Sequence, residues 1–129
     1  MTRPAILIVE DQSALRAALC DFLGAAFPEA TIHGASDGVE AAARCAAVQP
    51  DVVLMDVQLP DCSGIELTER LKAEFRRIRV IVMSYRSNGT YVERALAAGA
   101  CAFIPKDRLD SQLVAAVALA LSAPRAACR

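Results

Sequence analysis

The segment from Val52 to Pro60 constrains the fold of this chain more than any other stretch. Four consecutive apolar residues, 52–55, run directly into Asp56, and a proline follows four residues later. An unbroken apolar run this short is typical of a strand buried on both faces, as in a parallel sheet. Asp56 is then expected where the strand leaves the sheet, with its side chain at the mouth of a crevice and outside the core. Because ligands of open α/β sheets collect beyond the carboxyl ends of the strands, we predict that Asp56 is a nucleophile for a phosphoryl group.

Strand and helix patterns alternate along the rest of the chain. Further strands are predicted at residues 5–9, 31–33, 80–83 and 101–104. Between and after them, apolar residues at helical spacing predict five helices. Ser13 is expected to cap the first, which Gly24 and Pro28 bring to its close, and Ser63 is expected to cap the third. This order predicts a doubly wound α/β fold, a five-stranded parallel sheet flanked by five helices, and leaves the strand order open.

The second predicted helix opens at Asp37-Gly38 and is rich in alanine. Its spacing suggests one inward face, made by Val39, Ala42, Ala43 and Ala46.

Length and composition indicate a single cytoplasmic domain. The chain has 129 residues and a net charge of -1, which argues against nucleic-acid binding through a basic face. Its longest apolar run, residues 113–121, falls short of the roughly 20 residues that span a bilayer. The five cysteines are widely spaced without a C-x-x-C pair, as expected for reduced thiols in the cytoplasm. We assign residues 1–122 to the domain and residues 123–129 to a tail or the start of a linker.

Polar groups follow four of the predicted strands at their carboxyl ends. They are Glu10 with Asp11, then Asp56, then Ser84, then Lys106. A parallel sheet places these ends along one edge, so three carboxylates, a hydroxyl and an ammonium are expected in one pocket. Carboxylates packed together repel one another, which favours a hard divalent cation, and Mg²⁺ suits a site that leaves room for water and phosphate oxygens. With Mg²⁺ and Lys106 offsetting the phosphoryl charge, Asp56 can attack phosphorus while Ser84 donates a hydrogen bond.

At this point residues 4–122 resemble the receiver domain of bacterial two-component response regulators. The resemblance rests on Glu10-Asp11, on the segment 55–60 with 63–67, on Met83-Ser84, on 98–100 and on 103–106. It implies a flavodoxin-like fold with strand order 2-1-3-4-5. The segment 91–96 together with Lys106-Asp107 is most similar to receivers of LuxR/FixJ-type regulators.

The resemblance also implies roles for individual residues. Asp56 would accept a phosphoryl group from a sensor histidine kinase. Asp11, Asp56 and the backbone carbonyl of Gln58 would bind Mg²⁺, with Glu10 acting through water. Ser84 and Phe103 would form the switch pair: the hydroxyl moves toward the phosphoryl group, the ring turns inward, and the surface of the fourth helix, fifth strand and fifth helix repacks.

This sequence departs from the family pattern at three places. Lys106 is followed by Asp107 where the family often has a proline after a cis bond, so the cis geometry is in question. Tyr85 replaces the usual small residue and is predicted to narrow access to the pocket. Gln58 and Arg86 occupy variable positions beside the phosphoryl group, where they would set its lifetime in a direction that the sequence leaves open.

The leading hypothesis is therefore a signalling domain and not a metabolic enzyme, with phosphorylation from small donors and slow autodephosphorylation. It would control an output, transcription being the expected one, and touch DNA only through an output domain. A homodimer through the fourth helix, fifth strand and fifth helix, or through the first and fifth helices, is a further possibility; no membrane partner is expected. Two alternatives stay open: a receiver that acts unphosphorylated as an interaction module, and an aspartate-nucleophile phosphohydrolase. Cys62, near the pocket, is interpreted as a spectator thiol.

Overall fold

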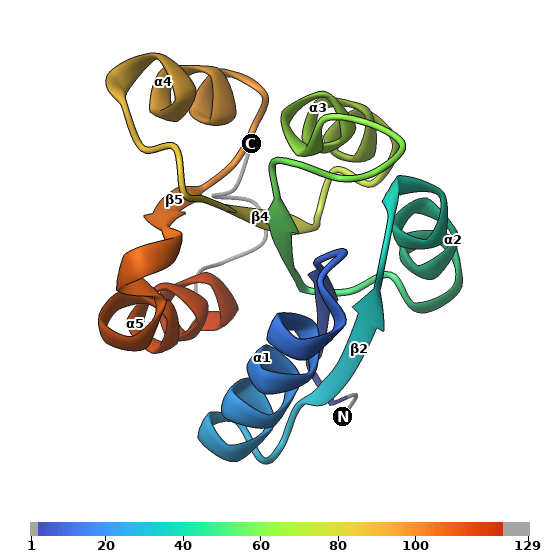
Figure 1. Cartoon of the computed structure of the whole chain (residues 1–129). Coiled ribbons are helices and arrows are strands. Elements are labelled where there is room, and N and C mark those ends of the chain that lie inside the picture. The colour runs from blue at the N-terminus through green and yellow to red at the C-terminus, as the bar shows by residue number, and fades with distance from the viewer. Residues whose placement is uncertain (1–2, 123–129) are drawn as a thin grey trace.

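The computed structural model describes residues 3–122. Strands and helices alternate along them (Figure 1). The strands are β1 Ala5–Val9, β2 Thr31–Ala35, β3 Val52–Asp56, β4 Arg79–Ser84 and β5 Ala102–Pro105. The helices are α1 Ser13–Ala26, α2 Gly38–Val48, α3 Gly64–Glu74, α4 Gly89–Ala97 and α5 Leu109–Ser122, with a 3₁₀ turn, η1, at Lys106–Arg108. The predicted tail, residues 123–129, lies outside the described range.

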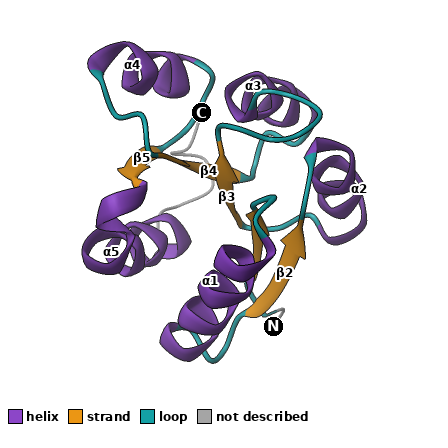
Figure 2. Ribbon diagram, in the orientation of Figure 1, coloured by secondary structure: helices purple, strands orange, loops and turns teal. Residues whose placement is uncertain are grey.

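The five strands form one parallel sheet in the order β2-β1-β3-β4-β5. This confirms the doubly wound fold and the strand order that the resemblance implied. Helices α1 and α5 cover one face of the sheet, and α2, α3 and α4 cover the other (Figure 2). Each parallel crossover therefore carries a helix over the sheet, as this topology requires.

Alternate residues of the central strands supply two hydrophobic cores, one on each face. Leu7, Val53 and Val80 pack on the side of α2, α3 and α4. Their neighbours Ile6 and Leu54 pack on the side of α1 and α5. Strands β1, β3 and β4 are buried along their whole length, which explains the continuous apolar runs 5–9, 52–55 and 80–83 within them.

The structure corrects the predicted start of α1. Its N-cap is Gln12, which makes no side-chain capping bond, and Ser13 is already helical. The helix continues past Gly24 to Ala26 and ends before Pro28, so its end falls between the two predicted stop residues. Ser63 caps α3 through its side chain as predicted, and Asp37, where the second helix was expected to open, caps α2 in the same way.

The predicted inward face of α2 is wrong for three of its four residues. Val39 is 74% exposed, and Ala43 and Ala46 are exposed, whereas the half-buried Ala42 packs against the core as predicted. The helix instead buries Gly38, Ala41 and Cys45 against the sheet. A helix of small residues has little hydrophobic contrast between its faces, so its position above the sheet selected the buried side.

Candidate functional site

The predicted site residues meet at one edge of the sheet. Asp56 and Ser84 are the last residues of β3 and β4, Glu10 and Asp11 follow β1, and Lys106 follows β5. A pocket of about 330 Å³ opens at this edge. It is lined by Glu10, Asp11, Gln12, Asp56, Gln58, Ser84, Tyr85, Arg86 and Lys106.

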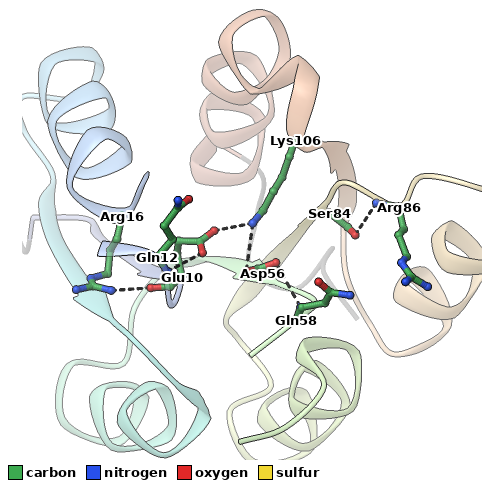
Figure 3. Close-up of polar contacts among 8 residues, drawn as sticks. All are labelled: Glu10, Gln12, Arg16, Asp56, Gln58, Ser84, Arg86 and Lys106. Carbon is green, nitrogen blue, oxygen red and sulfur yellow. Dashed lines mark hydrogen bonds and ion pairs between the residues drawn. The ribbon is translucent and has the colours of Figure 1, made fainter. Parts of the chain in front are cut away.

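Lys106 joins two of the carboxylates. Its Nζ lies 2.7 Å from Oε1 of Glu10 and 3.1 Å from Oδ2 of Asp56. Figure 3 shows the lysine reaching between the two acids. The three side chains are almost entirely buried, at 7% exposure for Lys106, 1% for Glu10 and 6% for Asp56. A close ion pair of this kind brings together residues 96 positions apart in the sequence.

The two carboxylates keep Lys106 charged. Burial alone would lower the pKa of the ammonium, but the hydrogen bond to Glu10 and the charges of Asp56 and Glu10 outweigh it and raise the pKa above its ordinary value of 10.5. The pocket therefore holds a fixed positive charge next to the Asp56 carboxylate throughout the neutral pH range.

Backbone and side-chain donors hold Glu10 in place. The amide of Gln12 donates to Oε2 of Glu10 at 3.0 Å, and the guanidinium of Arg16 donates to its carbonyl at 2.8 Å (Figure 3). The stem of Arg16 crosses β2 at Gly34, where an added Cβ would lie 3.3 Å from Cδ of the arginine. The sequence interpretation missed Gln12 and Arg16. Arg16 stands in an otherwise largely apolar first half of α1, a signal that could have identified it.

Three acids form a candidate cation site. Oxygens from Glu10, Asp11 and Asp56 lie within 4.8 Å of one another. Glu10 and Asp56 are buried and Asp11 is exposed at the rim. This all-oxygen set at an open pocket fits Mg²⁺, which takes one or two protein carboxylates and keeps several waters.

The Asp56 carboxylate is more buried than the sequence suggested. The residue is only 4% exposed, yet it lines the pocket and belongs to neither hydrophobic core, so its side chain lies outside the core as expected. The amide of Gln58 donates to its Oδ1 at 3.3 Å. Gln58 itself is exposed and lines the pocket in which its backbone carbonyl was expected to bind Mg²⁺.

The pocket is also lined by three consecutive residues at the end of β4, Ser84, Tyr85 and Arg86. The buried Ser84 hydroxyl accepts a hydrogen bond from the Arg86 amide at 3.0 Å. The Tyr85 ring is 76% exposed, and its centroid lies 5.2 Å from Nζ of Lys106. The Arg86 side chain leaves the pocket to donate to the Tyr91 hydroxyl at 3.2 Å.

Phe103 does not line the pocket. It is half-buried in β5 and packs against the core on the side of α2, α3 and α4. No peptide bond in residues 3–122 is cis, and this includes the bonds on both sides of Lys106.

Cys62 lies in the loop after β3, and no neighbouring cation outweighs the groups that raise the pKa of its thiol. Burial raises the pKa of its thiol, and the neighbouring Asp61 carboxylate raises it further. The thiol is therefore largely protonated at neutral pH, in keeping with a spectator role.

Comparison with known proteins agrees with this geometry. Residues 6–118 match the family described as the response regulator receiver domain. The chain is 38% identical over 114 residues to the DNA-binding transcriptional activator DevR/DosR of Mycobacterium tuberculosis, and 35% identical over 112 residues to the transcriptional activator protein ExaE of Pseudomonas putida. Each alignment covers 87% of this chain and 52% of the relative, so the chain spans about half the length of these proteins.

The solved structures give the same result. The signal receiver domain of a DNA-binding response regulator from Colwellia psychrerythraea superposes with a TM-score of 0.87 at 28% identity. The match covers 93% of this chain and 99% of that domain. Fold, pocket and sequence thus agree, and the chain belongs to the family of response regulator receiver domains.

Proposed function

We propose that Asp56 accepts a phosphoryl group from a sensor histidine kinase and that this modification switches the surface formed by α4, β5 and α5. The observation that carries the proposal is the position of Lys106, whose ammonium contacts both Asp56 and Glu10 in a pocket that also contains Asp11. The output is expected to be transcription, as the names of the related activators suggest.

In the transfer step, an Asp56 carboxylate oxygen forms a bond to phosphorus. The bond from phosphorus to the donor breaks, and the leaving group takes its electron pair. Lys106 lies beside the reacting oxygens and would offset the charge that the phosphoryl group brings. Asp11, Asp56 and the Gln58 backbone carbonyl would hold Mg²⁺, with Glu10 acting through water, and the ion would supply further positive charge at the phosphoryl oxygens.

The switch would use Ser84 and Phe103. The Ser84 hydroxyl accepts from the Arg86 amide, and its own O–H would donate to a phosphoryl group on Asp56, which would draw the side chain toward the pocket. Movement of Ser84 would open space for the half-buried Phe103 ring and so repack β5 against α4. Such a change is a population shift between two packings, driven by one added charge.

Tyr85, Gln58 and Arg86 would tune the rate and the lifetime of phosphorylation. Tyr85 lies over Lys106 at the pocket rim, where its ring restricts the approach of a donor. Gln58 and Arg86 flank the same opening and would position or exclude the hydrolytic water.

A groove of about 430 Å³ between α1 and α5 adjoins the pocket and would receive the kinase. Leu15, Leu19 and Phe22 contribute apolar surface to it, and Lys106 lines both the groove and the pocket.

The proposal also covers location and assembly. Among residues 3–122, none of the helices combines the length and the apolar character that crossing a bilayer requires. We place the domain in the cytoplasm, where the kinase presents its phosphohistidine. A homodimer is a further possibility, because Leu96 of α4 and Leu119 of α5 are 48% and 71% exposed.

Acetyl phosphate with Mg²⁺ tests the function directly. The wild-type protein is expected to gain the mass of one phosphoryl group, and Asp56→Asn is expected to gain none. Slow loss of that mass supports a switch with weak self-dephosphorylation. Rapid multiple turnover of acetyl phosphate would instead identify a phosphohydrolase, and no gain in either protein would favour an unphosphorylated interaction module.

A further inference from the structure

The loop that follows the phosphoacceptor, residues 57–63, carries Gln58 into the pocket. It is closed on itself by short-range backbone hydrogen bonds: the Leu59 amide donates to the Cys62 carbonyl at 3.3 Å, and the Gly64 amide donates to the Val57 carbonyl at 2.7 Å. These bonds set the shape of the loop. Its first residue is also fixed to the sheet, because Val57 is buried in the core and its amide donates to the Met83 carbonyl at 3.3 Å.

Asp61 connects the far side of the loop to a second element, helix α2. Its Oδ1 accepts from the Gly38 amide at 2.8 Å and its Oδ2 accepts from the Val39 amide at 3.0 Å. Both donors belong to the first turn of α2, more than twenty residues earlier in the chain. The hydrogen bond from Gly38 is the main reason that the pKa of Asp61 lies below its ordinary value, so the carboxylate is ionised at neutral pH.

Helix α2 also has a local N-cap that does not involve Asp61. Asp37 accepts from the Glu40 amide at 2.8 Å, and the Glu40 carboxylate accepts from the Ser36 amide at 3.0 Å. This arrangement resembles a capping box, except that Glu40 reaches the residue before the N-cap, and it leaves the amides of Gly38 and Val39 to Asp61. The two bonds to Asp61 are therefore an additional, tertiary contact.

Cys62, the residue after Asp61, also lies close against Gly38. A Cβ added to Gly38 would overlap Sγ of Cys62 and lie 3.2 Å from Oδ1 of Asp61. The absence of a side chain at position 38 is what lets the loop approach the helix backbone this closely.

We propose that Asp61 is a positioning residue for the phosphorylation pocket, acting by anchoring the 57–63 loop to the first turn of α2. Through this anchor it holds the Gln58 carbonyl and side chain at the pocket edge. The part of the inference that concerns Mg²⁺ rests on the proposed function, because it assumes that the Gln58 carbonyl is a ligand. The anchoring itself is independent of that assumption.

Two alanine variants separate anchoring from capping. Asp61→Ala removes the loop anchor, while Asp37→Ala removes the local cap of the same helix and changes the net charge equally. Asp61→Asn is a milder version, because its carboxamide can accept from only one of the two amides. Each protein is titrated with MgCl₂ and followed by backbone amide NMR shifts, and amide hydrogen exchange is measured without the ion.

Asp61→Ala is expected to bind Mg²⁺ about tenfold more weakly, the lower end of the effect of losing a group that orients a metal ligand, and Asp61→Asn is expected to show a smaller loss. Exchange at Leu59 and Gly64 is expected to speed up by about tenfold as the loop opens locally. Asp37→Ala is expected to keep the wild-type Mg²⁺ affinity within about twofold and the wild-type exchange rates in the loop, because its loss is confined to α2.

Equal Mg²⁺ affinity in the two alanine variants would overturn the positioning role, and unchanged loop exchange in Asp61→Ala would overturn the anchor. If the wild-type protein binds no Mg²⁺, the proposed function fails on its own, and the exchange rates then decide whether Asp61 anchors the loop.

Discussion

Replacing Lys106 by methionine tests the central ion-pair network of the pocket. Methionine keeps much of the length of the lysine stem but removes the ammonium. Glu10 and Asp56 then face each other almost fully buried, without the cation that lies 2.7 and 3.1 Å from their oxygens. The pair that the lysine stabilised becomes a repulsive one.

The expected cost follows from the burial of the partners. Removing one member of a buried ion pair typically costs about 3–5 kcal/mol, because a charge is left without compensation. The pocket here opens to water on one side, which screens the remaining carboxylates, so we expect a loss of about 2–4 kcal/mol. For a domain of this size that corresponds to a fall in Tm of about 10 °C.

The assay is urea unfolding at pH 7, followed by circular dichroism, with EDTA and with saturating MgCl₂. An ion at about a hundred times its Kd stabilises the folded state by about 2.7 kcal/mol. The gain should be larger in Lys106→Met than in the wild-type protein, since the ion no longer competes with an ammonium for the same oxygens. Lys72→Met is the control: Lys72 is also buried, and it donates to the carbonyls of Ile78 and Arg76 at 2.7 and 3.0 Å. Its loss of stability should not depend on Mg²⁺.

The pH dependence follows from the sign of the shift. Because the pKa of Lys106 is raised on folding, its contribution is complete below pH 10.5 and is lost only as the pH rises through the folded value. The deficit of Lys106→Met should therefore be constant near neutrality. A variant as stable as wild type in EDTA at pH 7, or one with no extra gain from Mg²⁺, would refute the electrostatic account of the pocket.

Two further predictions concern the loop and the rim of the pocket. Gly64→Ala should lower the free energy of unfolding in urea by more than about 3 kcal/mol, because the new Cβ would overlap the Asp56 carbonyl. Gly89→Ala, whose Cβ meets nothing within 4 Å, should raise it by up to about 1 kcal/mol. Similar stabilities of the two variants would show that the backbone can move Gly64 away from the Asp56 carbonyl. Tyr85→Ala should react faster with acetyl phosphate in a time course of intact mass, and Tyr85→Phe should behave as wild type, since either aromatic ring can cover Lys106. Unchanged phosphorylation and dephosphorylation rates in Tyr85→Ala would argue against a role for the ring in access.

The sequence identified most of the residues that meet in the pocket. Asp56, Ser84 and Lys106 could be placed because each follows an apolar strand, and parallel strands bring their carboxyl ends to one edge. Their pairing could not be read in the same way. Glu10 was expected at a metal ion through water, and the structure adds a direct ion pair with Lys106, formed by two residues 96 positions apart.

The chain's own pattern thus determined the strands, the parallel sheet and the edge at which the chemistry collects, because burial on both faces demands continuous apolar runs and leaves polar residues only at their ends. The tertiary structure decided which side of α2 is buried, how Glu10 is held by Gln12 and Arg16, and where Asp61 docks. Those features depend on distances between segments far apart in the sequence. Spacing along the chain carries no record of such distances, since a hydrogen bond or a packed face is formed only once the sheet has placed its helices.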